Sequence, residues 1–215
     1  PRIPGIPGED RPNVLNYAEV LAGNAEVGSR VAVIGAGGIG FDVSEYLLHD
    51  DVPLQPDPDD VSVEDFFAEW GVDMDFRTRG GVDGVEPKRH APAREIWMTQ
   101  RKTSKPGKGL GKTTGWIHRT TLKNHGVTML TGVDYEKIDD AGLHITIKDS
   151  DGNETRQVLD VDTVVLCTGQ VSENALYDAL KDAGQSVHII GGAKLAAELD
   201  AKRAIEDGVR VAVEI

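Results

Sequence analysis

The chain has 215 residues, of which 39% are hydrophobic and 27% charged, so it can form one large globular domain or two small ones. Its net charge of −13 argues against a general nucleic-acid binder or a protein of anionic membranes. No apolar run approaches the ~18 residues of a membrane span, and the first twelve residues lack a signal-peptide pattern. The single cysteine, Cys167, excludes a disulfide framework and a multi-thiolate metal site. We expect a cytoplasmic protein without a metal site.

The charge is unevenly spread along the chain. Ten lysines and arginines lie between Lys88 and Lys123, and Glu95 is the one acidic residue among them. This window carries +9 and leaves −22 for the remainder. A local basic segment on an acidic protein favours a small anionic ligand over a long polyanion, with a solvated basic loop as the alternative.

The first fifty residues predict the opening of a βαβ unit. Residues 1–12 are rich in proline and glycine and indicate a connector, and residues 13–22 indicate a short helix. An apolar strand is expected over residues 30–34, directly before a cluster of glycines. The apolar spacing over residues 41–48 is helical.

Residues 49–93 interrupt this unit as an insertion. It begins with an acidic, proline-rich loop at 50–60, and residues 61–70 have a helical apolar face. After it we expect a strand over 95–99, a basic loop over 100–111, a helix over 113–125 and a strand over 127–130, in that order.

The last third of the chain continues the alternation. A hairpin is expected from residues 143–148 and 157–159, with a turn at Asp151-Gly152 between them. Residues 161–167 form a continuous apolar run of the buried parallel-strand type. A helix over 174–183, a strand over 187–190 and a helix over 193–207 follow. The pattern predicts an α/β fold with a Rossmann-type doubly wound sheet.

The sharpest motif is Gly35-Ala36-Gly37-Gly38-Ile39-Gly40, a G-x-G-x-x-G sequence between the first strand and its helix. The first glycine permits a tight turn, the second lets a pyrophosphate approach the backbone, and the third lets the helix pack close to the strand. The helix N-terminus then offers N–H groups and partial positive charge to the phosphates. We expect a dinucleotide here rather than a structural glycine turn.

The next strand ends without the acidic residue that binds the ribose 2′-hydroxyl in NAD sites. Its end is Gln100-Arg101-Lys102 instead. Two cations at this position fit the 2′-phosphate of NADPH, so we predict NADPH rather than NADH as the coenzyme.

Other chemical motifs are weaker. The Walker pattern G-x-x-x-x-G-K-[ST] would need a glycine where Pro106 stands, so the stretch from Gly107 to Thr114 indicates a cationic loop over the dinucleotide and not an NTPase. The six histidines lack metal-ligand spacing. Cys167 ends a buried strand, where a small core residue is commoner than a nucleophile. We therefore assign no catalytic residue to this chain.

Four segments resemble a known family, and together they cover essentially the whole chain. They are residues 30–46, 98–122, 162–170 and 188–208. The run Gly-Leu-Gly-Lys-Thr-Thr-Gly-Trp-Ile-His-Arg-Thr-Thr at 109–121 is highly specific. The chain resembles the C-terminal part of the bacterial NADPH-dependent 2,4-dienoyl-CoA reductases, in the barrel–flavin group that includes trimethylamine dehydrogenase.

The resemblance implies a division into domains and a set of cofactors. Residues 25–160 would be an NADPH-binding domain inserted into an FAD-binding domain, whose segments would be 1–24 and 161–215. Members of the family also have an N-terminal barrel with FMN and an iron–sulfur cluster, and this barrel would be the partner of the present chain. Hydride passes from NADPH to FAD, and electrons continue to FMN.

The resemblance also adds candidate cofactor contacts. Thr168 and Gly169 would lie near both dinucleotides, and Gly191, Gly192 and Ala193 would form a turn at FAD. Asp42 matches a position that is often acidic in the group. Gly191-Gly192 departs from the usual Gly-Asp of that turn, which leaves FAD binding by this chain open.

The expected function is an NADPH-binding part of a flavin-dependent oxidoreductase, whose parent enzyme would reduce 2,4-dienoyl-CoA in unsaturated fatty acid degradation. The barrel, the cluster cysteines and the first FAD glycine motif are absent from the sequence. Two alternatives remain: another member of the barrel–flavin group, such as a trimethylamine dehydrogenase-like or enoate reductase-like protein, and a non-catalytic dinucleotide-binding module.

Overall fold

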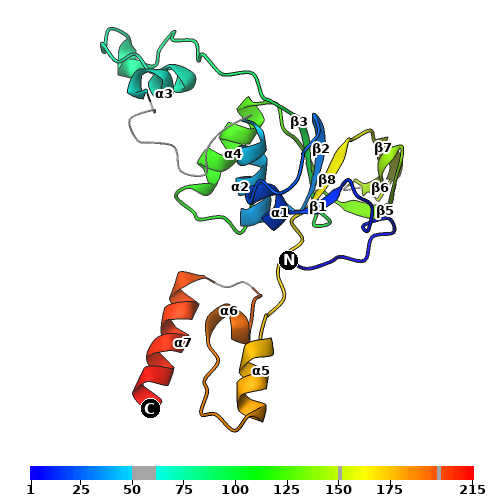
Figure 1. Cartoon of the computed structure of the whole chain (residues 1–215). Coiled ribbons are helices and arrows are strands. Elements are labelled where there is room, and N and C mark those ends of the chain that lie inside the picture. The colour runs from blue at the N-terminus through cyan, green and yellow to red at the C-terminus, as the bar shows by residue number, and fades with distance from the viewer. Residues whose placement is uncertain (50–61, 150–151, 198–199) are drawn as a thin grey trace. The chain divides into compact units, whose positions relative to one another are not determined.

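The computed structural model describes residues 1–49, 62–149, 152–197 and 200–215. The predicted acidic loop at 50–60 lies outside the described residues. The chain divides into two compact units (Figure 1). One comprises residues 5–167, and the other combines residues 1–4 with 168–215.

A five-stranded parallel sheet forms the centre of the larger unit. Its strand order is β1-β8-β2-β3-β4, and every neighbouring pair is parallel. The strands span β1 (Val14–Asn16), β2 (Arg30–Ile34), β3 (Glu95–Thr99), β4 (Thr128–Leu130) and β8 (Thr163–Leu166). The α/β class with a parallel sheet, expected from the sequence, is confirmed.

Side chains of the central strands alternate between two separate cores, as the pleat of a strand requires. Val31 and Val33 of β2 belong to one core, while Ala32 and Ile34 belong to the other. All four are almost fully buried. Strands buried on both faces appear in the sequence as unbroken apolar runs, which is why the sequence predicted them correctly.

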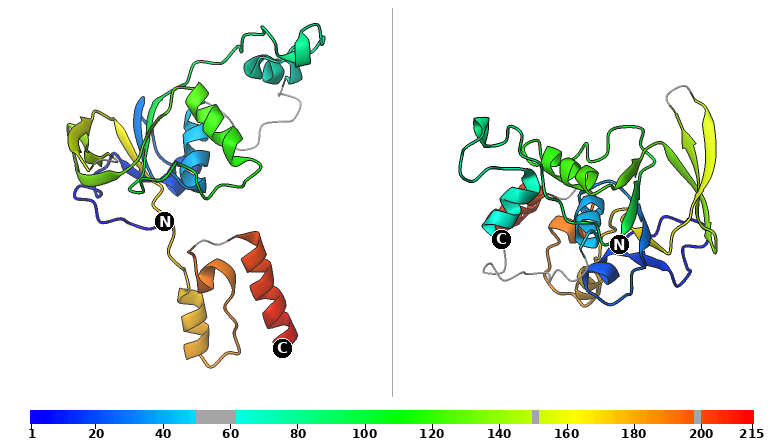
Figure 2. Two further views of the ribbon diagram at one scale, coloured as in Figure 1. Left: turned by 180° about the vertical axis from the view of Figure 1, so that it is seen from behind. Right: turned by 90° about the horizontal axis from the view of Figure 1, so that it is seen from above.

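The two faces of the sheet are covered differently. Helices α2 (Gly38–Leu47) and α4 (Gly115–Asn124) lie side by side on the first face (Figures 1 and 2), together with the short α1 (Tyr17–Leu21). The second face packs against an antiparallel sheet of order β5-β6-β7, formed by β5 (Val133–Asp139), β6 (Gly142–Lys148) and β7 (Glu154–Leu159). In the described part of the larger unit, this sheet takes the place that helices would have in a doubly wound fold.

The insertion contains one regular helix among its described residues, α3 (Val63–Trp70), followed by a 3₁₀ turn at Arg79–Gly81. Ser62 caps α3 by accepting a hydrogen bond from the Asp65 N–H at 3.1 Å. The Asp73 carboxylate accepts three backbone N–H groups, and these bonds lower its pKa against the opposing effect of desolvation. Local side-chain bonds of this kind order a segment that has little hydrophobic periodicity.

Among its described residues, the smaller unit contains three helices, α5 (Ala175–Asp182), α6 (Gly191–Lys194) and α7 (Ala201–Glu214). Asp200 caps α7 by accepting from the Arg203 N–H at 2.8 Å. The N-terminal segment joins this unit because the Arg2 N–H donates to the Gly169 carbonyl at 2.9 Å.

Three sequence predictions were wrong. Residues 14–16, expected in a helix, form β1, and α1 begins only at Tyr17 because Asn16 and Glu19 build a capping box there. The expected strand at 187–190 has no regular structure. The expected final helix at 193–207 is instead α6 and α7, separated by residues 195–200, of which 198 and 199 lie outside the described part.

The compact units divide the chain at positions other than the expected domain boundaries. Strands β1 and β8 come from segments that were assigned to an FAD-binding domain, yet they extend the same sheet as β2. The boundary between the units lies at 167/168 rather than 160/161. That residues 25–160 form an NADPH-binding domain, with 1–24 and 161–215 as segments of an FAD-binding domain, stays a prediction.

Candidate functional site

The glycine turn, residues 35–40, joins β2 to α2 at the carboxyl end of the parallel sheet. Gly35 has φ of +125°, and a methyl group there would lie 2.2 Å from the Cys167 carbonyl oxygen. A methyl group at Gly40 would lie 1.8 Å from the Gly35 carbonyl oxygen. These two glycines are therefore required by the fold itself, because helix and strand approach more closely than any side chain allows.

Gly37 and Gly38 are open where the other two are crowded. Nothing lies within 4 Å of a Cβ built at either position, and both residues are exposed. Gly37 is the N-cap of α2 with φ −91° and ψ −171°, which any residue can adopt. The absence of side chains here serves no packing purpose in the described structure and leaves space for a ligand at the backbone.

The N-terminus of α2 also has no side-chain cap among the described residues. The first N–H groups of a helix have no partner within the helix, and they carry the positive end of the helix dipole. Such a terminus binds phosphate well. The open glycines and the uncapped N–H groups together fit the pyrophosphate of a dinucleotide.

Arg101 and Lys102 follow the neighbouring strand at the same edge of the sheet. The Gly35 N–H donates to the carbonyl of Thr99, the last residue of β3, at 2.8 Å, so the two strand ends are directly joined. The Gly132 N–H holds the Lys102 carbonyl at 3.1 Å. Both cationic side chains are exposed, and neither forms an ion pair with a described residue. The glycine turn, predicted to bind the pyrophosphate, and the two cations, predicted to bind the 2′-phosphate, therefore both lie at the carboxyl end of the parallel sheet.

Tyr135 of β5 holds the carboxyl end of β3 in place. Its hydroxyl lies 2.9 Å from the Thr99 hydroxyl, which in turn donates to the Val33 carbonyl at 3.2 Å. Burial raises the pKa of Tyr135 to about 12, and the Thr99 hydrogen bond and the Arg101 charge oppose part of that shift. The antiparallel sheet thus fixes the end of β3, from which Arg101 projects.

The basic loop between β3 and α4 is tied to the glycine turn. The Gly107 N–H donates to the Ala36 carbonyl at 3.0 Å, and Arg119 of α4 donates to the Gly107 carbonyl at 3.2 Å. Gly107 has φ of +66°, and a Cβ there would lie 2.9 Å from the Phe41 ring. The stretch that begins at Gly107, which only partly matches a Walker motif, is therefore hydrogen-bonded to the glycine turn and lies beside it.

Asp42 and Cys167 lie close to the turn but have different surroundings. Asp42 is exposed one turn into α2. Cys167 is buried directly beneath Gly35, and its burial, with a smaller effect of the Asp42 charge, raises its thiol pKa to about 12. A thiol in this state is a core residue and not a nucleophile.

The candidates after residue 167 lie in the smaller unit. The Thr168 hydroxyl donates to the Arg2 carbonyl at 2.6 Å, and the Gly169 carbonyl accepts from Arg2. The Gly191 N–H donates to the Asp207 carboxylate at 3.2 Å, so that group is already satisfied. Gly192 and Ala193 lie in the four-residue α6. Contacts of these five residues with FAD stay a prediction.

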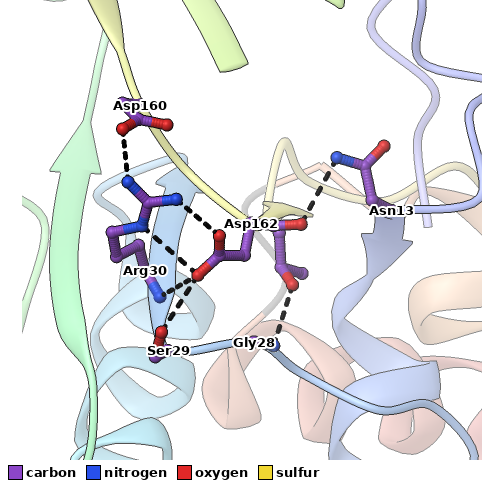
Figure 3. A network of polar contacts seen from close by, with 7 residues as sticks. Asn13, Gly28, Ser29, Arg30, Asp160 and Asp162 are labelled. Atoms are coloured by element: carbon purple, nitrogen blue, oxygen red, sulfur yellow. Dashed lines mark hydrogen bonds and ion pairs between the residues drawn. The ribbon is translucent and has the colours of Figure 1, made fainter. Parts of the chain in front are cut away.

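An ion-pair cluster that the sequence did not predict lies at the opposite end of the parallel strands, where β2 and β8 begin (Figure 3). Arg30 donates to Asp162 through its Nη2 at 2.7 Å and its backbone N–H at 2.9 Å, and it also pairs with Asp160. These bonds with Arg30 are the main reason why the pKa of Asp162 falls to about 2. The cluster joins the amino ends of β2 and β8, which is a structural role.

Three of the histidines, at positions 118, 125 and 144, also have structural partners. His118 Nδ1 lies 2.9 Å from the Glu45 carboxylate, which links α4 to α2. Within the described ranges, no three histidine, cysteine or acidic side chains gather as a metal site would require. No helix in the same part of the chain has both the length and the apolar character to cross a membrane.

The parallel sheet, with a glycine turn at the carboxyl end of its central strand, defines the class of protein as a Rossmann-type α/β fold. Residues 1–200 match the profile of a family. The chain belongs to the pyridine nucleotide-disulphide oxidoreductase family. With Cys167 as its single cysteine, the chain itself contains no cysteine pair.

Relatives are much longer than this chain. A metal reductase of Desulforamulus reducens is 26% identical over 193 residues, which cover 90% of this chain and 26% of that protein. Among solved structures, 2-naphthoyl-CoA reductase in complex with 2-naphthoyl-CoA matches with a TM-score of 0.68 and 21% identity, over 100% of this chain and 25% of that one. Histamine dehydrogenase from Rhizobium sp. 4-9 matches with a TM-score of 0.62 and 16% identity, over 98% and 27%. The chain thus spans about a quarter of the length of these proteins.

Proposed function

We propose that this chain binds NADPH and orients its nicotinamide for hydride transfer to a flavin carried by the same parent protein. The observation that carries the proposal is the open glycine turn. Gly37 and Gly38 leave space at the helix N-terminus that packing does not require, and the pyrophosphate of a dinucleotide fits there. Membership of the pyridine nucleotide-disulphide oxidoreductase family supports the same chemistry.

The residues of this chain act by binding and positioning. Backbone N–H groups of residues 37–40 hold the pyrophosphate, and Arg101 and Lys102 hold the 2′-phosphate by charge-assisted hydrogen bonds. The coenzyme, when bound, supplies a hydride from its nicotinamide ring, and the accepting FAD is reduced as the nicotinamide is oxidised. No side chain near the turn is needed as an acid or base for this step.

For the whole protein, we propose a reductase of the 2,4-dienoyl-CoA reductase type, with FMN and an iron–sulfur cluster in a preceding barrel. This finer assignment rests on the resemblance of residues 98–122 and 162–170 to that family. Assay of the full-length parent with NADPH and a 2,4-dienoyl-CoA ester tests it. Oxidation of NADPH without loss of the diene would contradict the substrate assignment and leave coenzyme binding standing.

Titration calorimetry with NADPH and NADH tests coenzyme binding by this chain. We expect tighter binding of NADPH. We also expect the variant Arg101→Ala with Lys102→Ala to lose about ten- to hundredfold in NADPH affinity, as the loss of one or two charged hydrogen bonds would cause. Affinity for NADH should change little. The exposed pair Lys88→Ala with Arg89→Ala is the matched control, because it removes the same charge from the insertion, where the Lys88 N–H donates to the Ala68 carbonyl of α3. A preference for NADH in the wild type would contradict the assignment.

A further inference from the structure

A second concave surface lies behind the basic loop, between α4 and the edge strand β4. Its volume is about 520 Å³, within the range of small-molecule sites. Its lining includes Lys105, Pro106, Trp116, Arg119, Lys123 and Val127. We call this surface the α4 groove. None of the residues assigned to the coenzyme lines it.

The α4 groove presents one complete face of a helix. Trp116, Arg119 and Lys123 are separated by three, four and seven residues, so they lie on the same side of α4. The other side of α4 is used for packing, because Leu122 is fully buried and His118 contacts Glu45 of α2. On the groove side, Arg119 donates one hydrogen bond to the Gly107 carbonyl, and none of the side chains of Trp116, Arg119 and Lys123 is buried.

The chemistry of the groove is cationic and aromatic. Lys105, Arg119 and Lys123 contribute three positive charges, and no acidic residue is among the lining side chains. None of the three forms an ion pair with any residue that the structure describes. Trp116 is 56% exposed, which leaves an indole face uncovered beside these charges. The nearly buried Val127 supplies an apolar floor.

The part of the groove formed by the basic loop is anchored by two hydrogen bonds of Gly107. Lys105 and Pro106 precede Gly107, whose N–H is bound to the Ala36 carbonyl and whose carbonyl accepts from Arg119. Arg119 keeps its remaining N–H donors for another group, because the guanidinium has five. A preorganised set of cations beside an exposed aromatic ring binds a phosphate and a stacked base at the same time.

We propose that the α4 groove is a second binding site, for a nucleoside phosphate whose base stacks on Trp116 and whose phosphates bind Arg119 and the two lysines. The site is separate from the glycine turn. Its ligand chemistry, a base with attached phosphate, occurs both in free ADP and in NADPH itself. The test must therefore separate the groove from the turn.

The probe is ADP, titrated calorimetrically into the full chain. We expect Lys105→Glu with Lys123→Glu to weaken this binding by about tenfold or more, because two attractive charges become repulsive. Trp116→Ala should weaken it by about tenfold through lost stacking, and Trp116→Phe should restore part of it. The control Lys88→Glu with Arg89→Glu changes the same net charge outside the groove and should leave ADP binding within about twofold of the wild type.

The turn variant Gly37→Ser separates the two sites. ADP binding that survives this change but is lost in the groove variants supports the proposal. Failure of ADP to bind, equal binding to the charge-reversed groove, or loss of all ADP binding in Gly37→Ser would overturn it. Circular dichroism and thermal melting of each variant verify folding, and Trp116→Phe gives a conservative test if Trp116→Ala fails to fold.

Discussion

Replacing Gly37 by serine should stabilise the protein and weaken coenzyme binding at the same time. Gly37 is the N-cap of α2, has an extended backbone and has no side-chain cap. Serine is among the best N-cap residues, because its hydroxyl accepts an N–H of the first helical turn. A Cβ at this position meets nothing within 4 Å, so the protein alone accommodates the new side chain. Relative to glycine we expect a gain of a few tenths of a kcal/mol.

The same hydroxyl occupies the space and the N–H group that the pyrophosphate needs. Loss of one hydrogen bond to a charged group costs about 1.5–3 kcal/mol, so NADPH affinity should fall by about ten- to hundredfold. Calorimetry measures the affinity, and thermal unfolding measures the stability. A Gly37→Ser protein that binds NADPH as tightly as the wild type would refute the assignment of the turn.

Gly40→Ala should give the opposite result for stability. The added methyl would lie 1.8 Å from the Gly35 carbonyl oxygen, against 3.4 Å or more in ordinary contacts, and a backbone atom cannot move aside as a flexible side chain can. Overpacking costs about 1–3 kcal/mol, and a 1.8 Å approach to a backbone oxygen belongs at the upper end of that range, above the gain of about 1 kcal/mol for alanine over glycine in a helix. Gly208→Ala in α7, whose new methyl would meet Ile190 at an ordinary 3.9 Å, is the matched control and should stabilise without changing NADPH affinity.

Three further predictions concern groups with altered pKa values. Asp162→Asn should lower the urea midpoint at pH 7. Because the native pKa of Asp162 is about 2 rather than 3.8, most of the stability from its ionised form is lost as the pH falls from about 4 to 2. The difference between variant and wild type should shrink over that range, and a difference as large at pH 2 as at pH 7 would contradict this. Cys167, with a thiol pKa of about 12 caused by burial, should resist iodoacetamide at pH 8 in the native protein and react in urea, whereas rapid native alkylation would place it at the surface. Tyr135, whose pKa burial raises to about 12, should form no phenolate near pH 10 in ultraviolet titration, and stability should fall as the pH rises from 10 to 12. Tyr135→Phe should make that fall smaller, and an unchanged fall would contradict the assignment.

The sequence predicted the centre of the fold because its signals are local. The apolar strand before Gly35 and the helix after Gly40 follow each other directly in the chain, as do the strand that ends at Thr99 and its two cations. β5 was missed because its pairing shifts between Tyr135 and Lys137, so Val133 and Ile138, both buried, are out of phase with a simple alternation.

The remaining features depend on contacts between distant residues. The bond between Gly107 and Ala36 joins positions 71 residues apart, and the pair of Arg30 with Asp162 joins positions 132 apart. No local pattern indicates either contact. The α4 groove could not be predicted from local patterns either. Trp116 and Lys123 show helical spacing in the sequence, but they are exposed because α4 packs Leu122 against α2.

Amide chemical shifts of the ¹⁵N-labelled chain during titration with NADPH test the binding account most directly, because they report each backbone N–H separately. We expect the largest shifts at residues 35–40, with a second group at Arg101 and Lys102 that is weaker or absent when NADH replaces NADPH. Saturating NADPH that leaves the amides of residues 35–40 unmoved, while shifting those of another surface, would contradict the central claim.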